Sequence, residues 1–411
     1  MFGTRRLFLS SASALASTGL ISLAPAAPRF LVESALLGAE RRGENILVVV
    51  QLSGGNDGLN TVVPYADEQY RRARHSLAIN KQAVLKIDDQ CGFHPSLKGF
   101  ARLWEARELA IVQGVGYPNP NRSHFEAMDI WNSGHSEVAQ QRSGWLGRAL
   151  DLHKTESTSD TIALHLGDEP QPLALTARGV ATPSVHSLER FKLDTSGDEM
   201  RRSAIQTSTQ LPRTNQNELL KFVQTTSTAA LAASQRIEAA AKNYQTSVKY
   251  PTSALAGKLK NVAQLIEAGL STRIYYVAID GWDTHSNQAA AHASLLEQLG
   301  DAVAAFTADL TQHGHGQRVV TLMFSEFGRR VQENASRGTD HGAAAPLFVA
   351  GAKVQAGLIG KQPSLTDLDD GDVKHHTDFR SVYAGLLEHW LKWPAAPVLG
   401  EKFAPLAVTE A

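Results

Sequence analysis

Residues 46–58 read ILVVVQLSGGNDG, in which a strand-like apolar run at 46–52, interrupted only by Gln51, leads into a glycine-rich turn. Such a run is typical of a central parallel strand that opens a βα unit, because helices cover both faces of a parallel sheet. Similar strand-like runs follow at 109–113, 161–166, 274–279, 319–324 and 347–350. Helical patterns alternate with them at 95–106, 295–313 and 379–391. This alternation predicts an α/β fold with a doubly wound, mostly parallel central sheet flanked by helices.

The composition is that of an ordinary globular protein. The chain has 411 residues, of which 43% are hydrophobic and 20% are charged, and this is enough to bury the core of one large domain or two. The formal net charge is -1, so no basic excess indicates a nucleic-acid partner. Cys91 is the single cysteine, which excludes an internal disulfide.

Residues 1–27 have the features of a twin-arginine (Tat) export signal. Arg5 and Arg6 precede a weakly apolar, Ser/Ala-rich stretch, and an Ala-Pro-Ala cleavage pattern follows Leu23. The stretch is too short and too polar to form a stable transmembrane anchor. We therefore expect the Tat translocase as a partner during export, and a periplasmic or secreted location for the mature protein.

Residues 28–411 are predicted to form a single domain with one insertion. The segment at about 187–257 interrupts the strand-helix alternation, because it is first polar and then rich in Ala, Ser, Thr and Gln. Good helix formers over 229–244 favour a mostly helical insertion or cap over the sheet. A disordered linker is the alternative.

Two short stretches bring an aspartate and a histidine close together after a strand-like run. Residues 281–285 read GWDTH and residues 338–342 read GTDHG. Ligands of open α/β sheets gather at the carboxyl ends of strands, so these stretches predict part of a metal site. The candidate ligands are Asp283, His285, Asp340 and His341. The side chains of the last two diverge unless the backbone turns sharply, which the flanking glycines permit.

Three further polar groups have both a functional and a structural interpretation. Asp57, in the turn after the first strand, can approach a metal ion closely or satisfy its own backbone. Ser123 begins a predicted helix, where it can act as a nucleophile among free N–H groups or as an ordinary N-cap. His376, or its neighbour His375, can close the site or lie at the surface among acidic residues.

The mixture of carboxylates and imidazoles indicates which chemistry to expect. It suits zinc, manganese or iron, whereas the shortage of thiolates disfavours a structural cysteine-zinc site. Two ions roughly 3.5 to 4 Å apart can clamp the attacking and leaving oxygens of a phosphoryl or sulfuryl transfer. The chain has no GxGxxG after the first strand, no P-loop, no GxSxG and no HExxH.

Several longer segments resemble a known bacterial family. They read QLSGGNDGLNTVVP, GYPNPNRSHFEAMDIW, DGWDTHSNQ, FSEFGRRVQENASRGTDHG and TDFRSVYAGLLEHWL. Together they resemble the Tat-exported family called domain of unknown function 1501 (DUF1501), over nearly all of the mature chain. That family is similar to the alkaline phosphatase and sulfatase superfamily, whose members are α/β enzymes with two metals and a Ser, Thr or modified Cys nucleophile.

The resemblance implies a role for each candidate residue. Ser123 would attack the phosphorus or sulfur atom, and Arg122 or His124 would steady the transferred group. The two divalent ions, zinc, manganese or similar, would each have three ligands: Asp57, Asp340 and His341 for one, and Asp283, His285 and His376 for the other. Glu326 and Asn56 would orient ligands, although Glu326 equally fits an ion pair in the core.

Two departures from the superfamily's pattern are visible. The superfamily usually spaces this Asp and His by three residues, whereas only one residue lies between Asp283 and His285. The Cys/Ser-x-Pro-x-Arg signature of sulfatases is also missing.

From the resemblance we expect an exported metal-dependent hydrolase of small phosphate or sulfate esters. The alternative is a non-catalytic periplasmic scaffold or binding protein that has the same fold and a degenerate metal site.

Overall fold

The structure is a computed structural model, and it describes residues 44–136, 142–153, 162–185 and 244–410. The expected export signal at 1–27 lies outside these residues, as does most of the expected insertion at 187–257. Within the described part of the chain, no helix combines the length and the apolar character needed to cross a bilayer.

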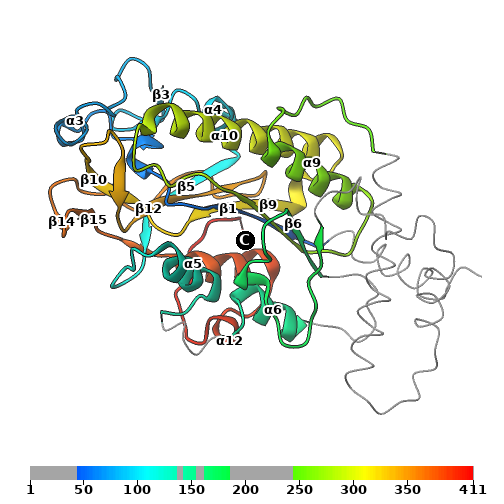
Figure 1. Cartoon of the computed structure of the whole chain (residues 1–411). Helices are drawn as coiled ribbons and strands as arrows, with labels where there is room; N and C mark the ends of the chain where they lie inside the picture. The colour runs from blue at the N-terminus through cyan, green and yellow to red at the C-terminus, as the bar shows by residue number, and fades with distance from the viewer. Residues whose placement is uncertain (1–43, 137–141, 154–161, 186–243, 411) are drawn as a thin grey trace, which may run out of the picture.

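A nine-stranded sheet forms the centre of the molecule (Figure 1), with the strand order β13-β5-β12-β9-β1-β8-β6-β7 and β16 paired to β5. Its strands are β1 (Ile46–Leu52), β5 (Leu109–Gly116), β6 (Ala163–Leu166), β7 (Ser184–Val185), β8 (Ile274–Ile279), β9 (Val319–Ser325), β12 (Ala345–Ala350), β13 (Gly357–Ile359) and β16 (Thr377–Asp378). The pairings are parallel except those of β12, which runs antiparallel to β5 and β9.

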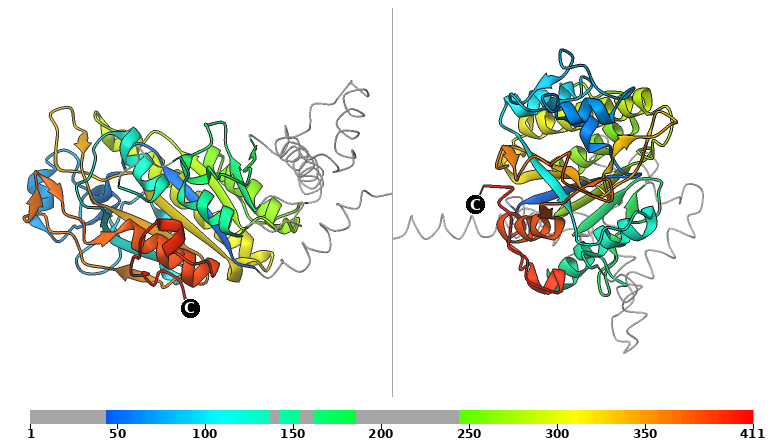
Figure 2. Two further views of the ribbon diagram at one scale, coloured as in Figure 1. Left: turned by 90° about the horizontal axis from the view of Figure 1, so that it is seen from below. Right: turned by 90° about the vertical axis from the view of Figure 1, so that its left-hand side faces the viewer.

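Helices cover both faces of this sheet, as the views from two further sides also show (Figure 2). One layer contains α4 (Lys98–Glu105), α9 (Ala254–Glu267) and α10 (Gln288–Gln312). The other contains α5 (His124–Ser133), α6 (Trp145–His153), α11 (Phe379–Gly385), which continues into a π-helical turn at Leu386–Leu391, and α12 (Ala396–Leu399). The predicted α/β fold with a mostly parallel, helix-flanked sheet is confirmed.

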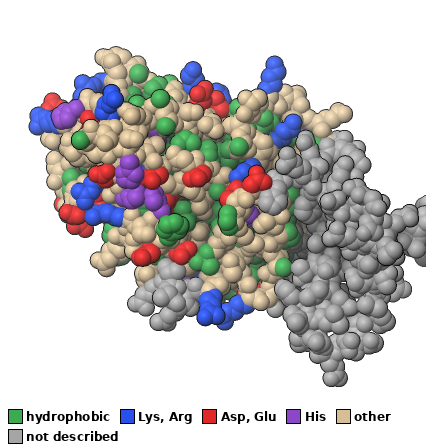
Figure 3. Space-filling view, viewed as in Figure 1, with side chains coloured by type: hydrophobic (Ala, Val, Ile, Leu, Met, Phe, Trp, Pro, Cys, Tyr) green, Lys and Arg blue, Asp and Glu red, His purple; other side chains and the backbone are tan. Residues whose placement is uncertain are grey.

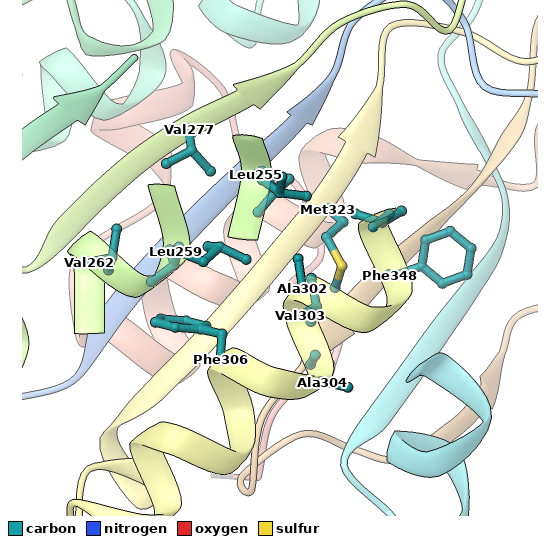
Figure 4. Close-up of a cluster of buried hydrophobic side chains, with 14 of the residues drawn as sticks. Leu255, Leu259, Val262, Val277, Ala302, Val303, Ala304, Phe306, Met323 and Phe348 are labelled. Carbon is teal, nitrogen blue, oxygen red and sulfur yellow. The ribbon is translucent and has the colours of Figure 1, made fainter. Parts of the chain in front are cut away.

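The apolar run of β1 is buried on both sides, because alternate residues of a strand point to opposite faces. Val48 and Val50 belong to the core under α9 and α10, whereas Leu47 and Val49 belong to the core under α5 and α6. Figure 4 shows part of the first core, where Phe306 of α10 is drawn with side chains from α9 and from the sheet. Fully burying such a side chain contributes about 1.5–3 kcal/mol.

Residues 244–257 are the described end of the expected insertion, and they belong to the layer that contains α9 and α10. Asp309 of α10 is fully buried and accepts hydrogen bonds from Thr246 Oγ1 (2.5 Å) and Tyr250 Oη (2.7 Å). Soon afterwards the chain enters α9, which Ser253 caps by accepting from the Ala256 N–H. The last residues of the 187–257 segment are thus part of the sheet's covering layer.

Smaller elements lie around the ends of the central strands. They are α3 (Glu68–Ala73), the sheet of β2 (Val62–Val63), β3 (Leu85–Lys86) and β4 (Gly92–Phe93), the hairpin of β10 (Arg329–Glu333) and β11 (Thr339–His341), the hairpin of β14 (Leu368–Asp369) and β15 (Asp372–Val373), and three 3₁₀ turns at Gly58–Asn60, Leu173–Leu175 and Gly316–Arg318. The β10–β11 hairpin follows β9 closely. Asp340 and His341 therefore lie on a strand of this hairpin, not in a loop directly after a central strand.

Candidate functional site

Four side chains from three separate segments converge beyond the carboxyl ends of the central strands. We call them the His/Asp cluster: His124 from the start of α5, Asp283 and His285 from the loop after β8, and His341 from β11. The ligand atoms of His124, Asp283 and His341 all lie within 4.8 Å of one another. Figure 3 shows a surface patch of histidine side chains bordered by acidic and apolar ones. The cluster is partly exposed, with side-chain exposure of 21% for His341 and 47% for Asp283.

The ligand atoms of the cluster lie at short distances from one another. Asp283 Oδ1 is 3.0 Å from His285 Nε2, 3.2 Å from His341 Nε2 and 3.5 Å from His124 Nε2. The Nε2 atoms of His285 and His341 are only 2.8 Å apart. Three ring nitrogens thus each lie within 3.5 Å of one carboxylate oxygen.

The other ring nitrogen of each histidine has a separate partner. His341 Nδ1 lies 2.8 Å from the backbone carbonyl of Arg122, and His124 Nδ1 lies 2.8 Å from Glu326 Oε1. His285 Nδ1 lies 3.3 Å from Asp340 Oδ1. Since a carbonyl or carboxylate oxygen only accepts, these contacts assign the proton to Nδ1 and leave a lone pair on Nε2. Asp340 and Glu326 therefore hold imidazoles by their outer nitrogens.

Charge in the cluster is set by burial and by Arg329. Burial lowers the pKa of His341, which favours its neutral form. Burial opposes ionisation of Asp283, but the hydrogen bond and the positive charge of Arg329 outweigh this effect and lower its pKa to about 2. The hydrogen bond to Glu326 raises the pKa of His124 despite partial burial.

Arg329 is the residue that ties the segments of the site together. Its fully buried guanidinium donates to the carbonyls of Gly54, Gly55, Trp282 and Thr339 and to Asp283 Oδ1, the last at 2.8 Å. Because the guanidinium presents its donors in a rigid plane, these contacts fix the turn after β1, the loop after β8 and β11 relative to one another.

Glycines let these segments approach closely. Gly54 has φ +124°, and a Cβ there would lie 2.4 Å from the Asp283 backbone nitrogen. Gly338 and Gly342 do not have positive φ, so the chain does not use the left-handed freedom that these glycines permit. A Cβ on Gly338 would lie 2.2 Å from the His285 carbonyl carbon. Its role is close backbone packing, which brings β11 against the loop after β8.

Asp57 and Asn56 are directed away from the His/Asp cluster into a buried polar network. Both oxygens of Asp57 face the guanidinium of Arg74, and both side chains are fully buried. Asn56 Oδ1 accepts from Thr61 Oγ1 (2.9 Å) and lies 3.0 Å from His292 Nε2. The described contacts of these two residues do not include a histidine or aspartate of the cluster.

Arg122 and Ser123 lie beside the cluster in the chain, but their side chains are used differently. The guanidinium of Arg122 pairs with Asp372 (2.9 Å from Nε) and Asp370 (3.0 Å) of the β14–β15 hairpin, so only its carbonyl touches the cluster. Ser123 is exposed and occupies the N-cap position of α5, yet its hydroxyl makes no cap hydrogen bond. Among the described contacts, its hydroxyl has no bond to the cluster.

His376 lies on the other side of β5. Its backbone N–H donates to the Gly114 carbonyl (2.8 Å), and its ring packs where a Cβ on Gly114 would be, with Cδ2 3.0 Å from that position. The side chain is exposed. No described hydrogen bond or ion pair connects it with the His/Asp cluster.

An open pocket of about 420 Å³ adjoins the cluster. Its polar lining includes Asp129, Asp280, Asp283, Glu326 and His124, and its apolar lining includes Phe125 and Met128. Phe125 is 86% exposed, which is unusual for a large apolar side chain on this protein. None of the described residues that line the pocket is Lys or Arg.

Two arginines in this region carry roles that the sequence did not reveal. Arg329 was part of the SEFGRR motif, but its spacing indicated nothing about the carbonyls it binds. Arg74 lies in a charged helix end, where RRAR is typical of a solvated surface. No spacing rule could have paired Arg74 with an aspartate 17 positions earlier.

Comparison with known proteins gives a family and several distant structural likenesses. A sequence model of the family described as "Protein of unknown function (DUF1501)" matches residues 44–387. No curated protein matches the chain in sequence.

Among solved structures, PsFucS1 sulfatase from Pseudoalteromonas sp. is similar at 9% identity, with 93% of this chain and 74% of that chain covered and a TM-score of 0.36. The lipoteichoic acid synthase LtaP from Listeria monocytogenes is similar at 9% identity, with 92% and 80% covered and a TM-score of 0.34. Alkaline phosphatase from the Antarctic bacterium TAB5 is similar at 9% identity, with 74% and 91% covered and a TM-score of 0.32.

Proposed function

The chain belongs to the DUF1501 family, and we propose that it is an exported, metal-dependent hydrolase of phosphate or sulfate esters. In this proposal the His/Asp cluster holds a divalent ion through His124, Asp283, His285 and His341. The adjoining pocket receives the ester. The twin-arginine pattern of residues 1–27 would direct the protein through the Tat translocase to the periplasm or medium.

The proton positions in the cluster carry the proposal. His341 donates its Nδ1 proton to the Arg122 carbonyl, so its Nε2 presents a lone pair. That lone pair faces Asp283 Oδ1 at 3.2 Å and His285 Nε2 at 2.8 Å. Acceptor atoms this close repel one another unless a proton or a cation lies between them. A shared cation satisfies all of them at once.

The donor set fits such an ion. Tetrahedral zinc with bonds of 2.0–2.1 Å separates its ligand atoms by roughly 3.3 Å. The contacts of Asp283 Oδ1 to the three Nε2 atoms span 3.0 to 3.5 Å, whereas the Nε2 atoms of His285 and His341, at 2.8 Å, would have to move apart to share the ion. Each ligand histidine also has the outer partner on Nδ1 that metal-bound imidazoles usually have. A bound divalent ion would polarise the ester oxygens and lower the pKa of a hydroxyl beside it.

The pocket's own charge supports dependence on an ion. Its described lining has four carboxylates and no Lys or Arg, so by itself it repels an anionic phosphate or sulfate group. The nearby arginines are already paired: Arg329 with Asp283 and with backbone carbonyls, and Arg122 with Asp370 and Asp372. An anionic ester can bind there only when a cation offsets this charge.

Ser123 is the nucleophile in this proposal. Its hydroxyl is exposed, makes no cap bond and precedes the ligand His124 directly in the chain. Its oxygen would form a bond to phosphorus or sulfur as the bond to the ester oxygen breaks, and the alcohol would leave with the serine proton. Water would then cleave the seryl ester, which restores Ser123 and releases phosphate or sulfate.

The experiment compares four proteins in the hydrolysis of an aryl phosphate and an aryl sulfate, with metal content measured on the same samples. Wild type and Ser294→Ala, an exposed serine of α10, should hydrolyse one ester. His341→Ala should lose the ion and the activity, and Ser123→Ala should keep the ion and lose the activity. Hydrolysis that survives His341→Ala would overturn the metal-dependent mechanism, and hydrolysis that survives Ser123→Ala would overturn the serine's role alone.

A non-catalytic binding protein is the second candidate, and one observation favours it. Asp57 and His376, which the resemblance implies as ligands, make no described contact with the cluster. A protein that binds a divalent ion tightly yet hydrolyses neither ester class would support this second function.

A further inference from the structure

We infer that the guanidinium of Arg74 takes the place of a second metal ion at Asp57, so that the chain binds one ion and not two. Resemblance to the two-metal superfamily implies Asp57 as a ligand of an ion. The residues around Asp57 do not fit that role. The inference rests on the proposed function for the ion that remains, in the His/Asp cluster.

Asp57 and Arg74 form a two-pronged ion pair in a fully buried setting. Arg74 Nη1 lies 2.5 Å from Asp57 Oδ2, and Arg74 Nη2 lies 3.0 Å from Asp57 Oδ1. Neither side chain is exposed to solvent. Burial opposes ionisation of Asp57, but the charge and hydrogen bonds of Arg74 outweigh it, and the pKa of Asp57 is lowered. A permanent internal cation thus already neutralises this carboxylate.

Asp57 also accepts a hydrogen bond from a residue other than Arg74. Gln288 of α10 donates its amide to Oδ2. The orientation of this amide is fixed, because its Oε1 accepts from the hydroxyls of Thr284 (3.1 Å) and Thr339 (2.6 Å). An ion at Asp57 would have to displace an amide that two hydroxyls hold in place.

Arg74 also donates hydrogen bonds to the backbone of β10. Its Nε donates to the Val331 carbonyl (2.7 Å) and its Nη2 to the Arg330 carbonyl (2.9 Å). If Arg74 moved aside for a metal ion, two carbonyls would lose their donor, and a buried guanidinium would lose its carboxylate. Both losses are costly in a dry environment, so Arg74 excludes the ion.

The Asp57–Arg74 ion pair does not bind an ion; its role is to position the metal centre in the His/Asp cluster. Thr284 lies between Asp283 and His285, and Thr339 directly precedes Asp340. Through Gln288, Asp57 is therefore connected to two of the three segments that supply the His/Asp cluster. Asp57 supports the centre from its interior side without contacting the ion, and Arg74 keeps that support electrically neutral.

The test is a count of bound ions by native mass spectrometry and elemental analysis, after loading the whole mature protein with zinc or with manganese. Single substitutions would leave one buried charge unpaired, so the variant is the double substitution Asp57→Asn/Arg74→Gln, which removes both charges. We expect one ion per chain in the wild type and in the double variant, and none in His341→Ala.

Two ions in the wild type, with one lost from the double variant, would overturn the inference. If the double variant does not fold, the wild-type count decides: one ion supports the inference and two overturn it. An absence of bound ions in the wild type would instead overturn the proposed function, and the one-ion centre with it. The two failures therefore have different signatures.

Discussion

His341 donates a hydrogen bond from Nδ1 to the backbone carbonyl of Arg122, 2.8 Å away. This contact connects β11 to the segment that starts α5, and it directs the lone pair of His341 Nε2 toward Asp283. A backbone carbonyl cannot lose this role through side-chain motion, so the tautomer of His341 is fixed by the fold. It therefore fixes the direction in which one imidazole of the His/Asp cluster points.

Replacing His341 should weaken metal binding most strongly. We expect His341→Ala to lower the affinity for zinc at least 100-fold, since it removes a ligand whose orientation is already fixed. Isothermal titration calorimetry measures this change. His75→Ala, at an exposed histidine of the same protein, is the matched control and should bind as the wild type does. Equal affinities of the two variants would exclude His341 as a ligand.

Glu326 should tune the centre through His124. The buried carboxylate accepts from His124 Nδ1 and from the Gly54 N–H, both at 2.8 Å. Glu326→Gln keeps the shape but removes the charge, so His124 becomes a less basic ligand, and affinity should fall about 10- to 100-fold. In metal-free protein the pKa of His124 should also fall, which NMR titration detects. Glu388→Gln, at an exposed position, should change neither value.

Arg329 should matter for stability as well as for metal binding. Its five acceptors lie in three segments, and lysine, with three donors, must leave at least two of them unpaired. Each unpaired buried group costs about 1–3 kcal/mol, so Arg329→Lys should lower the free energy of unfolding by several kcal/mol in urea denaturation. The exposed substitution Arg71→Lys should have no measurable effect, and an equally mild effect of Arg329→Lys would contradict the assigned contacts.

Stability should fall in mild acid because of a buried histidine. Burial lowers the pKa of His292 from 6.5 to about 4, against the opposing charge of Asp57. Below pH 6.5 the unfolded chain therefore takes up a proton that the folded chain excludes, and stability is lost between pH 6.5 and 4. One such residue accounts for about 3 kcal/mol at most.

Unfolding measured across this range provides the check on His292. His292→Gln retains a donor for Asn56 and should make the pH profile flatter, whereas His75→Gln should leave it unchanged. An unchanged slope in His292→Gln would mean that another group causes the loss. The depressed pKa of Asp57 acts in a separate range, below about pH 4.

Phe125 should contribute to binding of the ester. Its ring is 86% exposed at the pocket beside His124, where it can cover the apolar part of an aryl ester. Phe125→Ala should raise KM several-fold with little change in kcat, because the ring lies in the binding pocket and is no ligand of the ion. Leu152→Ala, at an exposed leucine outside the lining, is the control. A fall in kcat alone would contradict this role.

Much of the fold could be predicted from the sequence because its signals are local. The runs at 46–52 and 274–279 are strands with those same bounds, since buried parallel strands are continuously apolar. The helix expected at 295–313 begins earlier, at Gln288, because its first turns carry the polar Gln288 inward to Asp57. Periodicity alone misses a helix whose buried side includes a polar contact.

The site was harder to predict, because its contacts span distant parts of the chain. Three of the residues singled out from the sequence, Asp283, His285 and His341, lie close together in the structure, although His341 is on the β10–β11 hairpin and not at the end of a central strand. The sequence pattern gave no information about the hydrogen-bond or ion-pair partner of each side chain. Asp57 pairs with Arg74 and Asp340 faces His285 Nδ1, and both choices depend on loops whose paths local patterns do not encode.

An anomalous-difference map of metal-loaded crystals, recorded at the absorption edge of the ion, tests the central claim most directly. The account predicts one peak per chain, bounded by Nε2 of His124, His285 and His341 and by the carboxylate of Asp283. A peak beside Asp57, or the absence of a peak from the His/Asp cluster at saturating metal, would contradict it.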